Sequence, residues 1–341
     1  MRWPVLLCCA LLGGCSTIGY YGQLAAGQKA LMRAREPISR IVADPSRDPG
    51  LRQRLQRASE ARRWAVQHLL LPDNRSYSSY VELNRPYVLW NLFATPELSV
   101  EPLQHCFPLV GCVAYRGYYR RESAERAAQR LREQGNDVHI AGVPAYSTLQ
   151  WFDDPLLSSM MHWSDETLIA TVFHELAHQK LFVPGDTEFN ESFASFVGAE
   201  GLRQYLRAHG GDDAAFREEQ RRRAELTALV LASRQRLAQI YAGDSGHALK
   251  RQLKRTEFDR LRSEYRALRD GRWQGDASYD ALIDRLDGNN AALLPFGLYD
   301  AGVPAFAALF AAEQRDWARF YRAATALAES PERRRALLQA R

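Results

Sequence analysis

The residues with the clearest chemical potential form the run His174-Glu175-Leu176-Ala177-His178. Residues four apart on a helix lie on one face, so the two imidazoles can bind a single ion. Glu175 can approach a water molecule beside that ion without binding the ion itself. Zinc lowers the pKa of such a water, and a nearby carboxylate can accept its proton. The run predicts a catalytic zinc site; the alternative is a pair of histidines satisfied inside a core, where ionisable groups are expensive.

A catalytic zinc needs a third protein ligand and an open fourth position. Glu191 is the preferred ligand, because a turn at Pro184-Gly185-Asp186 is followed by a second helix that begins near Phe189. The alternative is a first-turn acid that only complements the helix dipole. Asp186 and Glu188 are rival ligands, although both lie in the turn. The expected cofactor is one Zn²⁺ ion, held by His174, His178 and Glu191.

Two helices must bring these side chains together. The first begins at Ser164, a capping residue followed by acids, and carries a broad apolar face. The second helix ends at Gly210-Gly211. Its small residues favour a close approach of the two helices, and they are Ala194, Ser195 and Gly198.

The amino terminus is typical of a lipoprotein signal peptide. Arg2 precedes an apolar run that is too short to span a bilayer. Leu12-Gly13-Gly14-Cys15 resembles the bacterial lipobox, in which the cysteine receives the lipid and becomes the first mature residue. Residues 1–14 are then the signal peptide; the alternative is an ordinary signal peptide cut nearby. Because Ser16 follows and not an aspartate, we expect a lipid anchor in the outer membrane and a body in the periplasm.

Cysteine usage agrees with an oxidising compartment. Once the three amino-terminal cysteines are set aside, Cys106 and Cys112 remain, on either side of a Pro/Gly turn. This arrangement predicts a local disulfide. Two buried thiols are the alternative, and a metal site is disfavoured because no further Cys or His stands nearby at ligand spacing.

Composition and charge exclude some functions. Hydrophobic residues make up 46% of the 341 residues and charged residues 25%, which favours a folded protein over a disordered one. The net charge of +5 arises from Arg-rich stretches that also carry acids, such as 217–225. Such stretches are typical of solvated helix faces, so we expect no nucleic-acid partner.

The pattern along the chain predicts a helix-dominated α+β fold. Turn residues and hydrophobic periods divide the mature chain into four parts. These are amino-terminal helices at 15–70 (18–40 and 50–70), a catalytic core at 71–210, a long helical hairpin at 211–275 and a helical segment at 276–341 that packs on the core. Extended runs at 76–95, 113–115 and 137–141, with a helix at 122–134, predict a small mixed sheet within the core. The hairpin offers a surface on which a protein partner could dock.

The two metal motifs resemble those of the gluzincin metallopeptidases, whose third ligand is a glutamate on the following helix. Asn190-Glu191-Ser192-Phe193-Ala194 is close to the N-E-G-F-A run of zinc aminopeptidases. The whole chain also resembles a family of bacterial lipoproteins described as putative aminopeptidases. The matching stretches are 106–112, 115–118, 145–149, 151–152, both metal motifs and 289–291. The resemblance implies a zincin-like catalytic domain.

Three features depart from the large aminopeptidases. Only twelve residues separate His178 from Glu191. The G-A-M-E-N-type motif that captures a free amine has no counterpart here. Ser195 stands where thermolysin-like enzymes have an aspartate that braces the first histidine. Hydrolysis by zinc survives these differences, but strict exopeptidase activity does not follow.

The zincin resemblance implies further site residues. A strand at the sheet edge before the metal helix usually pairs with the substrate backbone, and residues 141–149 are in position for it. A plain core strand is the alternative. The substrate-binding residues expected there are Gly142, Val143, Ala145 and Tyr146.

Such enzymes also use a Tyr or His to stabilise the oxyanion. Tyr299 is the preferred residue, with His247 and Tyr205 as competitors and a core aromatic as the alternative. We therefore expect a lipid-anchored, zinc-dependent peptidase of the periplasm that acts on a peptide or protein substrate. The alternatives are an envelope endoprotease of narrow specificity and a non-catalytic scaffold that keeps zinc for structure.

Overall fold

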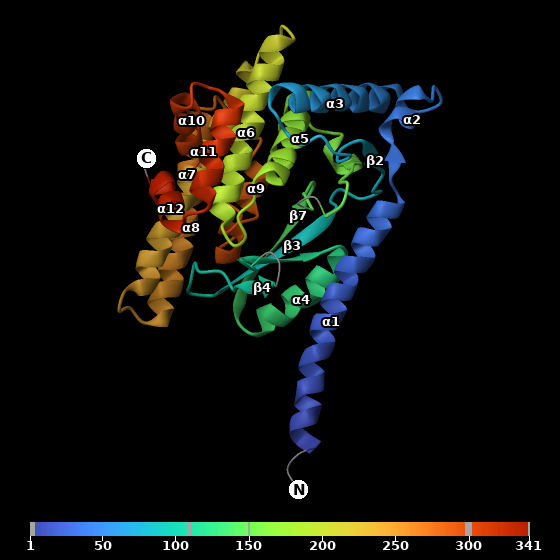
Figure 1. Cartoon of the computed structure of the whole chain (residues 1–341). Helices are drawn as coiled ribbons and strands as arrows, with labels where there is room; N and C mark the ends of the chain where they lie inside the picture. The colour runs from blue at the N-terminus through green and yellow to red at the C-terminus, as the bar shows by residue number, and fades with distance from the viewer. Residues whose placement is uncertain (1–3, 108–110, 149–150, 297–301, 340–341) are drawn as a thin grey trace.

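Helices dominate the chain, and the strands form small sheets among them (Figure 1). The computed structural model describes residues 4–107, 111–148, 151–296 and 302–339. The helix-dominated α+β class expected from the sequence is confirmed.

The central sheet is antiparallel, with the order β6-β3-β7 among the described residues. Its strands are β3 (Leu89–Pro96), β6 (Tyr115–Tyr118) and β7 (Asn136–Val143). Alternate residues point to opposite faces of a strand. On one face, Trp90, Leu92 and Val138 pack against the alanines of α4 (Arg121–Glu133). On the other face, Asn91 and Tyr115 line the site described below, while Phe93 packs against Ala291 and Leu294.

The expected strand over 141–149 is wrong at 144–148, and Leu149 lies outside the described residues. The ladder between β3 and β7 ends at the pair Leu89 and Val143. Pro144 follows and has no N–H group to donate to a ladder. Its carbonyl instead accepts a hydrogen bond of 2.6 Å from Ser159 Oγ.

The helices α5 (Asp165–Lys180) and α6 (Thr187–Ala208) cross in close contact above this sheet. Ser164 caps α5 by accepting a hydrogen bond from Thr167 N. Gly198 permits the crossing, because a Cβ atom placed there would lie 2.7 Å from Ala170 O and 3.2 Å from His174 Cβ. The small residue at this position thus sets the distance between the two metal-motif helices.

The amino-terminal part differs from the expected helix over 18–40. Helix α1 (Pro4–Arg33) starts earlier and ends earlier, and Cys15 falls within it. Glu36 and Pro37 form β1, which pairs with β2 (Ser79–Val81). Pro37 cannot supply the N–H group that the interior of a helix requires, so the expected helix does not continue through it. The short helix α2 (Ile38–Ala43) follows, and α3 (Pro49–His68) lies across the top of α5.

Helix α1 runs along one side of the body, and its amino end extends beyond it (Figure 1). It is tied to the central sheet through Gln23, which donates to Gly117 O and accepts from Tyr119 N. Gly27 lies against the Tyr119 ring, where a Cβ atom would come within 2.1 Å. Among the described residues, no helix combines the length and hydropathy needed to cross a membrane.

Helices α7 (Ala214–Ala242) and α8 (His247–Asp270) form a long hairpin with its own apolar core. The link to the central sheet runs through Asn290, in the 3-10 turn η2 (Asn290–Leu293). Its side chain donates to Glu97 O and Ser99 O and accepts from Tyr241 OH, while its backbone N–H reaches Asp137. This fully bonded asparagine joins the hairpin to the strands.

The carboxyl-terminal helices pack on α6. Phe193 of α6 contacts the rings of Phe306 and Phe320. The helices concerned are α10 (Val303–Ala312), α11 (Trp317–Ala328) and α12 (Pro331–Gln339), preceded by the short α9 (Asp280–Asp284). The remaining short elements are β4 (His105–Phe107), β5 (Gly111–Val113), β8 (Leu156–Leu157) and η1 (Ser158–Met160).

Candidate metal centre and its cavity

Three side chains from α5 and α6 converge on one point. The Nε2 atoms of His174 and His178 lie 3.1 Å apart. Glu191 Oε2 lies 3.3 Å from the first of these atoms and 3.5 Å from the second. Among the described residues, these three are the group of His, Cys, Asp and Glu side chains whose ligand atoms all lie within 4.8 Å of one another.

The turn between the helices positions Glu191. Asp186 caps α6 by accepting from Phe189 N. The buried Asn190 holds the turn from within, because its side chain accepts from Val183 N at 2.7 Å and donates to Val183 O at 2.8 Å. Glu191 is the next residue, so its direction is fixed by a hydrogen-bonded neighbour.

The rival ligands lie elsewhere. Asp186 Oδ2 is paired with Arg334 Nε at 2.6 Å, and Glu188 is exposed. Neither belongs to the group of converging ligand atoms. Of the three acids considered from the sequence, the structure brings only Glu191 to the histidines.

The chemistry of the donor set fits a divalent ion. Burial raises the pKa of Glu191, but the nearby His174 and His178 nitrogens lower it more strongly, to about 2. Its Oε2 atom is buried without a hydrogen bond of good geometry to any described residue. Two imidazole nitrogens and one charged carboxylate are the ligand set of many catalytic zinc sites.

Glu175 lies beside this group and not within it. Burial raises the pKa of Glu175, while the neighbouring histidines act in the opposite direction. Only 8% of the residue is exposed, and it lines the same cavity as the three converging side chains. It therefore occupies the place expected of a base that acts next to a metal.

A cavity of about 620 Å³ opens over the site, which is in the range of binding sites for small ligands. The helices α5 and α6 form one wall, and the strands β3, β6 and β7 form another. The amino-terminal helix and the β4–β5 hairpin complete it. These last two contribute mostly apolar or aromatic side chains, namely Tyr20, Tyr21, Leu24, Phe107 and Val113.

The cysteine pair shapes that wall. Cys106 and Cys112 are joined by a disulfide across β4 and β5. Phe107 and Val113, next to the two cysteines, line the cavity. The hairpin also meets the turn before α6, because a Cβ atom on Gly111 would lie 3.2 Å from Gly185 Cα.

The expected substrate-binding residues divide into two groups. Val143, Ala145 and Tyr146 line the cavity, and β7 is an edge strand among the described residues. Gly142 does not line it, because its position is covered by the Tyr87 ring, 2.2 Å from where a Cβ atom would lie. Three of the four residues therefore border the space in which a substrate would bind.

The expected oxyanion residue, Tyr299, lies outside the described residues. Its competitors have other surroundings: the Tyr205 ring contacts the rings of Trp64 and His209, and His247 is exposed at the start of α8. Neither contributes to the cavity lining.

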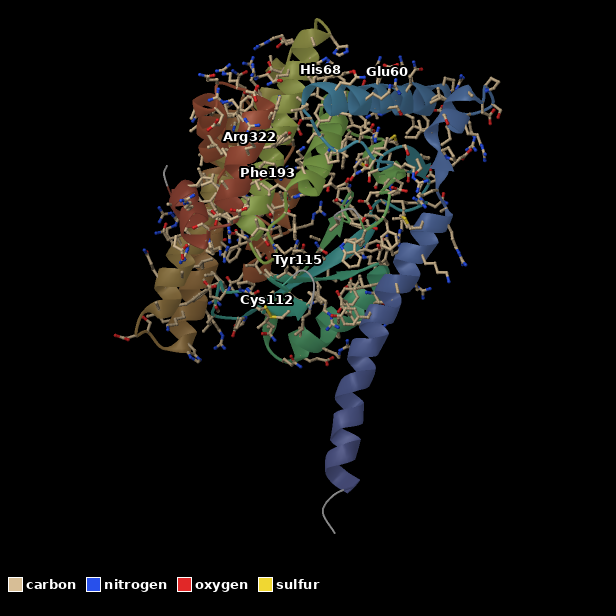
Figure 2. The ribbon with its side chains drawn as sticks, in the orientation of Figure 1. Glu60, His68, Cys112, Tyr115, Phe193 and Arg322 are labelled. Carbon is tan, nitrogen blue, oxygen red and sulfur yellow. A yellow bond between two sulfur atoms is a disulfide. The ribbon has the colours of Figure 1, made fainter. Side chains whose placement is uncertain are left out.

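Tyr115 is a cavity residue to which the sequence argument assigned no role. It lies on β6, between the sheet and the helices above it (Figure 2). Burial raises its pKa, and the negative charge of Glu191 raises it further, so the hydroxyl keeps its proton. The available signal was its place in the run 115–118 that resembles the lipoprotein family.

A buried polar group stands behind Glu175. Asp154, 2% exposed, accepts hydrogen bonds from Thr148 N and Thr148 Oγ1 at 2.8 and 2.7 Å. Burial raises the pKa of Asp154 to about 6, partly offset by these bonds, and the charge of Glu175 adds to the rise.

Comparison with known proteins supports a peptidase assignment. A family model described as "Putative aminopeptidase" matches residues 19–338. No curated protein and no solved structure gives a significant match. Because the family match spans nearly the whole chain, this protein belongs to the putative aminopeptidase family.

Proposed function

We propose that this protein is a zinc-dependent peptidase whose ion is held by His174, His178 and Glu191. The convergence of their ligand atoms within 4.8 Å, at the floor of a cavity, is the observation that carries the proposal. The family description supports peptide-bond hydrolysis as the reaction. A zinc ion would supply Lewis acidity, which polarises the scissile carbonyl and makes a water molecule more acidic.

Glu175 is the proton carrier in this proposal. As the water attacks the carbonyl carbon, Glu175 accepts its proton, and it then donates that proton to the leaving amine as the C–N bond breaks. Its burial favours both steps, because a carboxylate with a raised pKa holds the proton between them.

Tyr115 is the preferred residue for stabilising the oxyanion. It lines the cavity and keeps its hydroxyl proton, so it can donate a hydrogen bond as negative charge develops on the carbonyl oxygen. Tyr146 also lines the cavity, but its hydroxyl already donates to Gln28 Oε1.

We further propose that Cys15 carries a lipid and that the body lies in the periplasm on the outer membrane. The lipobox-like run before Cys15 and the disulfide in the β4–β5 hairpin support this location. Metabolic labelling with a fatty acid tests it, and labelling that persists in a Cys15→Ala variant would contradict it.

The central experiment compares metal content and cleavage in the full chain purified in detergent. Wild-type protein should carry about one zinc per chain. Glu175→Gln should keep the metal and lose cleavage of a peptide library by about 10²–10⁴-fold, because only the proton transfer is removed. Glu166→Gln, near the start of the same helix, is the matched control. Full activity in the Glu175→Gln variant would defeat the assigned role.

A further inference from the structure

Both carboxylates of the described cavity wall already have a role in the proposed metal site. Among the described lining residues, the carboxylates are Glu175 and Glu191, and there is no Asp, Lys or Arg. Glu191 faces the two histidines, and Glu175 is the proton carrier. These described residues therefore offer no further carboxylate to pair with a charged amino terminus of a peptide.

Asn91 is an uncharged polar residue of the wall with a buried side-chain atom that lacks a hydrogen-bond partner among the described residues. It lies on the central strand β3, is 9% exposed, and lines the cavity. Its Oδ1 atom makes no hydrogen bond with any described residue. A buried carboxamide oxygen without a partner costs about 1–3 kcal/mol, so such a group calls for an explanation.

The neighbours of Asn91 leave it open to the cavity. Its partners across the sheet are Gly117 on β6 and Ala141 on β7, both small. Residues of the same parity along β3 share its face, and Leu89 also lines the cavity. The carboxamide thus stands over small neighbours on the face toward the metal site.

Three other uncharged polar residues of the wall have partners within the protein. Asn190 is bonded at both ends to Val183. The Tyr146 hydroxyl donates to Gln28. Ser147 also has a partner.

We propose that the Asn91 carboxamide binds an uncharged peptide group of the substrate, so that the cavity takes internal or amino-blocked peptide segments with apolar side chains. An amide has one donor and one acceptor, which a carboxamide can match. The apolar wall of Tyr20, Leu24 and Phe107 suits the side chains of such a segment. This proposal rests on the peptidase function and names its substrate class.

A peptide with a free amino terminus and one with a blocked amino terminus differ in the cost of entering the cavity. A free amino terminus is a cation at neutral pH, and burying it without a counter-charge is costly. A peptide bond or an acetyl group in the same place is neutral and needs only hydrogen bonds. The preference therefore runs against the capture of a charged amine that defines an exopeptidase of amino termini.

Binding and cleavage must be measured separately. The full chain carrying Glu175→Gln, loaded with zinc, is titrated by calorimetry with a short Phe- and Leu-containing peptide in free-amine and Nα-acetyl forms. The acetyl form should bind at least about tenfold more tightly, a difference of about 1.4 kcal/mol. Adding Asn91→Leu should weaken the acetyl form about tenfold, and adding Asn91→Asp should shift the preference to the free amine.

Thr95→Val is the matched control. Thr95 lies on the same strand with a buried, unpartnered hydroxyl, but it is not part of the cavity wall. It should leave both affinities unchanged. Tighter binding of the free amine, unchanged affinity in Asn91→Leu, or no binding of either peptide would overturn the proposal. If the acetyl form binds as expected while the protein with Glu175 intact cleaves neither peptide, the hydrolase function fails and the Asn91 assignment stands.

Discussion

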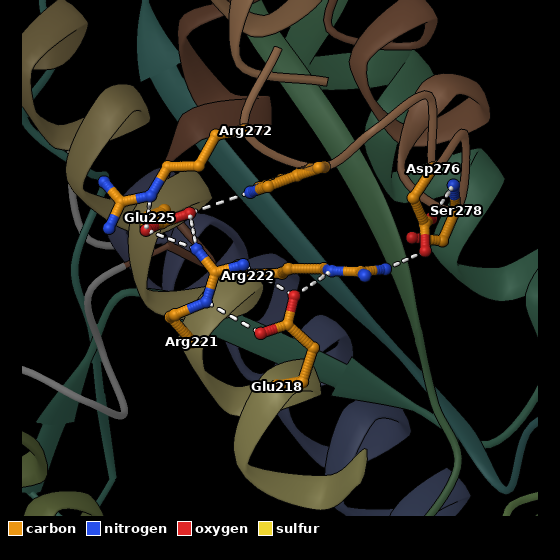
Figure 3. A network of polar contacts seen from close by, with 8 residues as sticks. Glu218, Arg221, Arg222, Glu225, Arg272, Asp276 and Ser278 are labelled. Carbon is orange, nitrogen blue, oxygen red and sulfur yellow. Dashed lines mark hydrogen bonds and ion pairs between the residues drawn. The ribbon is translucent and has the colours of Figure 1, made fainter. Parts of the chain in front are cut away.

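The crossing of α5 and α6 and the Arg-rich surface of α7 place their charged residues in opposite ways. Between α5 and α6, ionisable side chains face one another inside the protein, next to a glycine crossing. On α7, Glu218, Arg221 and Glu225 pair along the partly exposed surface of the helix, and Arg222 reaches Asp276 beyond α8 (Figure 3).

This difference in burial indicates which charged residues have a chemical role. A partly exposed ion pair contributes little free energy and forms wherever Arg and Glu meet at helical spacing. Buried ionisable groups are expensive, so they persist as ion pairs, such as Lys254 with Asp137, or where a chemical task needs them. The Arg-rich hairpin is stabilised mainly by its apolar core, whose residues include Val230, Phe258 and Trp273.

The largest expected effect on zinc content and cleavage is that of replacing Glu191. Glu191→Gln replaces a charged ligand with a neutral one, so zinc content should fall to near zero and cleavage by more than about 10³-fold. Glu188→Gln is the control, because this exposed rival acid lies outside the converging group. Metal analysis that finds zinc lost in Glu188→Gln and retained in Glu191→Gln would reverse the assignment.

The next effect concerns the oxyanion. Tyr115→Phe should lower kcat by about 10²–10³-fold with a small change in KM, because the hydroxyl acts as charge develops. Tyr146→Phe should change kcat little, since its hydroxyl is held by Gln28. Steady-state kinetics on one peptide decides between them, and equal losses in both variants would contradict the role of Tyr115.

A smaller effect should appear in the pH dependence of stability. The pKa of Asp154 is raised from 3.8 to about 6 in the folded state. Between those pH values the folded protein holds a proton that the unfolded chain releases, so this group makes stability fall as pH rises. Asp154→Asn removes the slope, and its free energy of unfolding relative to wild type should rise by about 2–3 kcal/mol from pH 4 to pH 6. The free energy of unfolding is measured by urea titration at each pH. The same pH dependence in wild type and in Asp154→Asn would contradict the prediction.

The smallest effect is expected on the hairpin. Arg222→Met breaks the partly exposed contacts with Glu218 and Asp276, and should lower the free energy of unfolding by about 1 kcal/mol or less. Zinc content and cleavage should be unchanged. Arg255→Met, an exposed position on α8, is the control. A loss of activity in Arg222→Met would contradict this and show that the hairpin surface affects the metal site.

Local patterns in the sequence were sufficient for much of the site. The spacing of His174 and His178 sets them on one helix face whatever the rest of the chain does, because helical geometry is local. The turn before α6 and the small Gly198 indicated a crossing that would bring Glu191 near them. The α+β class followed from the same kind of periodic pattern.

Two of the expected elements were wrong because each contains a proline. Pro144 ends β7 before the expected strand is complete, and Pro37 lies in a strand and not in a helix. Both follow from the missing N–H group of proline, which overrides the apolar pattern around it.

The tertiary structure alone decided which residues share the cavity. Tyr20 of α1, Asn91 of β3 and Tyr115 of β6 are far apart in the sequence, and no periodicity joins them to His174. Their meeting depends on strand register and on helix packing, which result from the sum of many long-range contacts. The sequence indicated the converging side chains because a helix repeats every few residues, whereas the packing of distant elements decided the cavity walls around them.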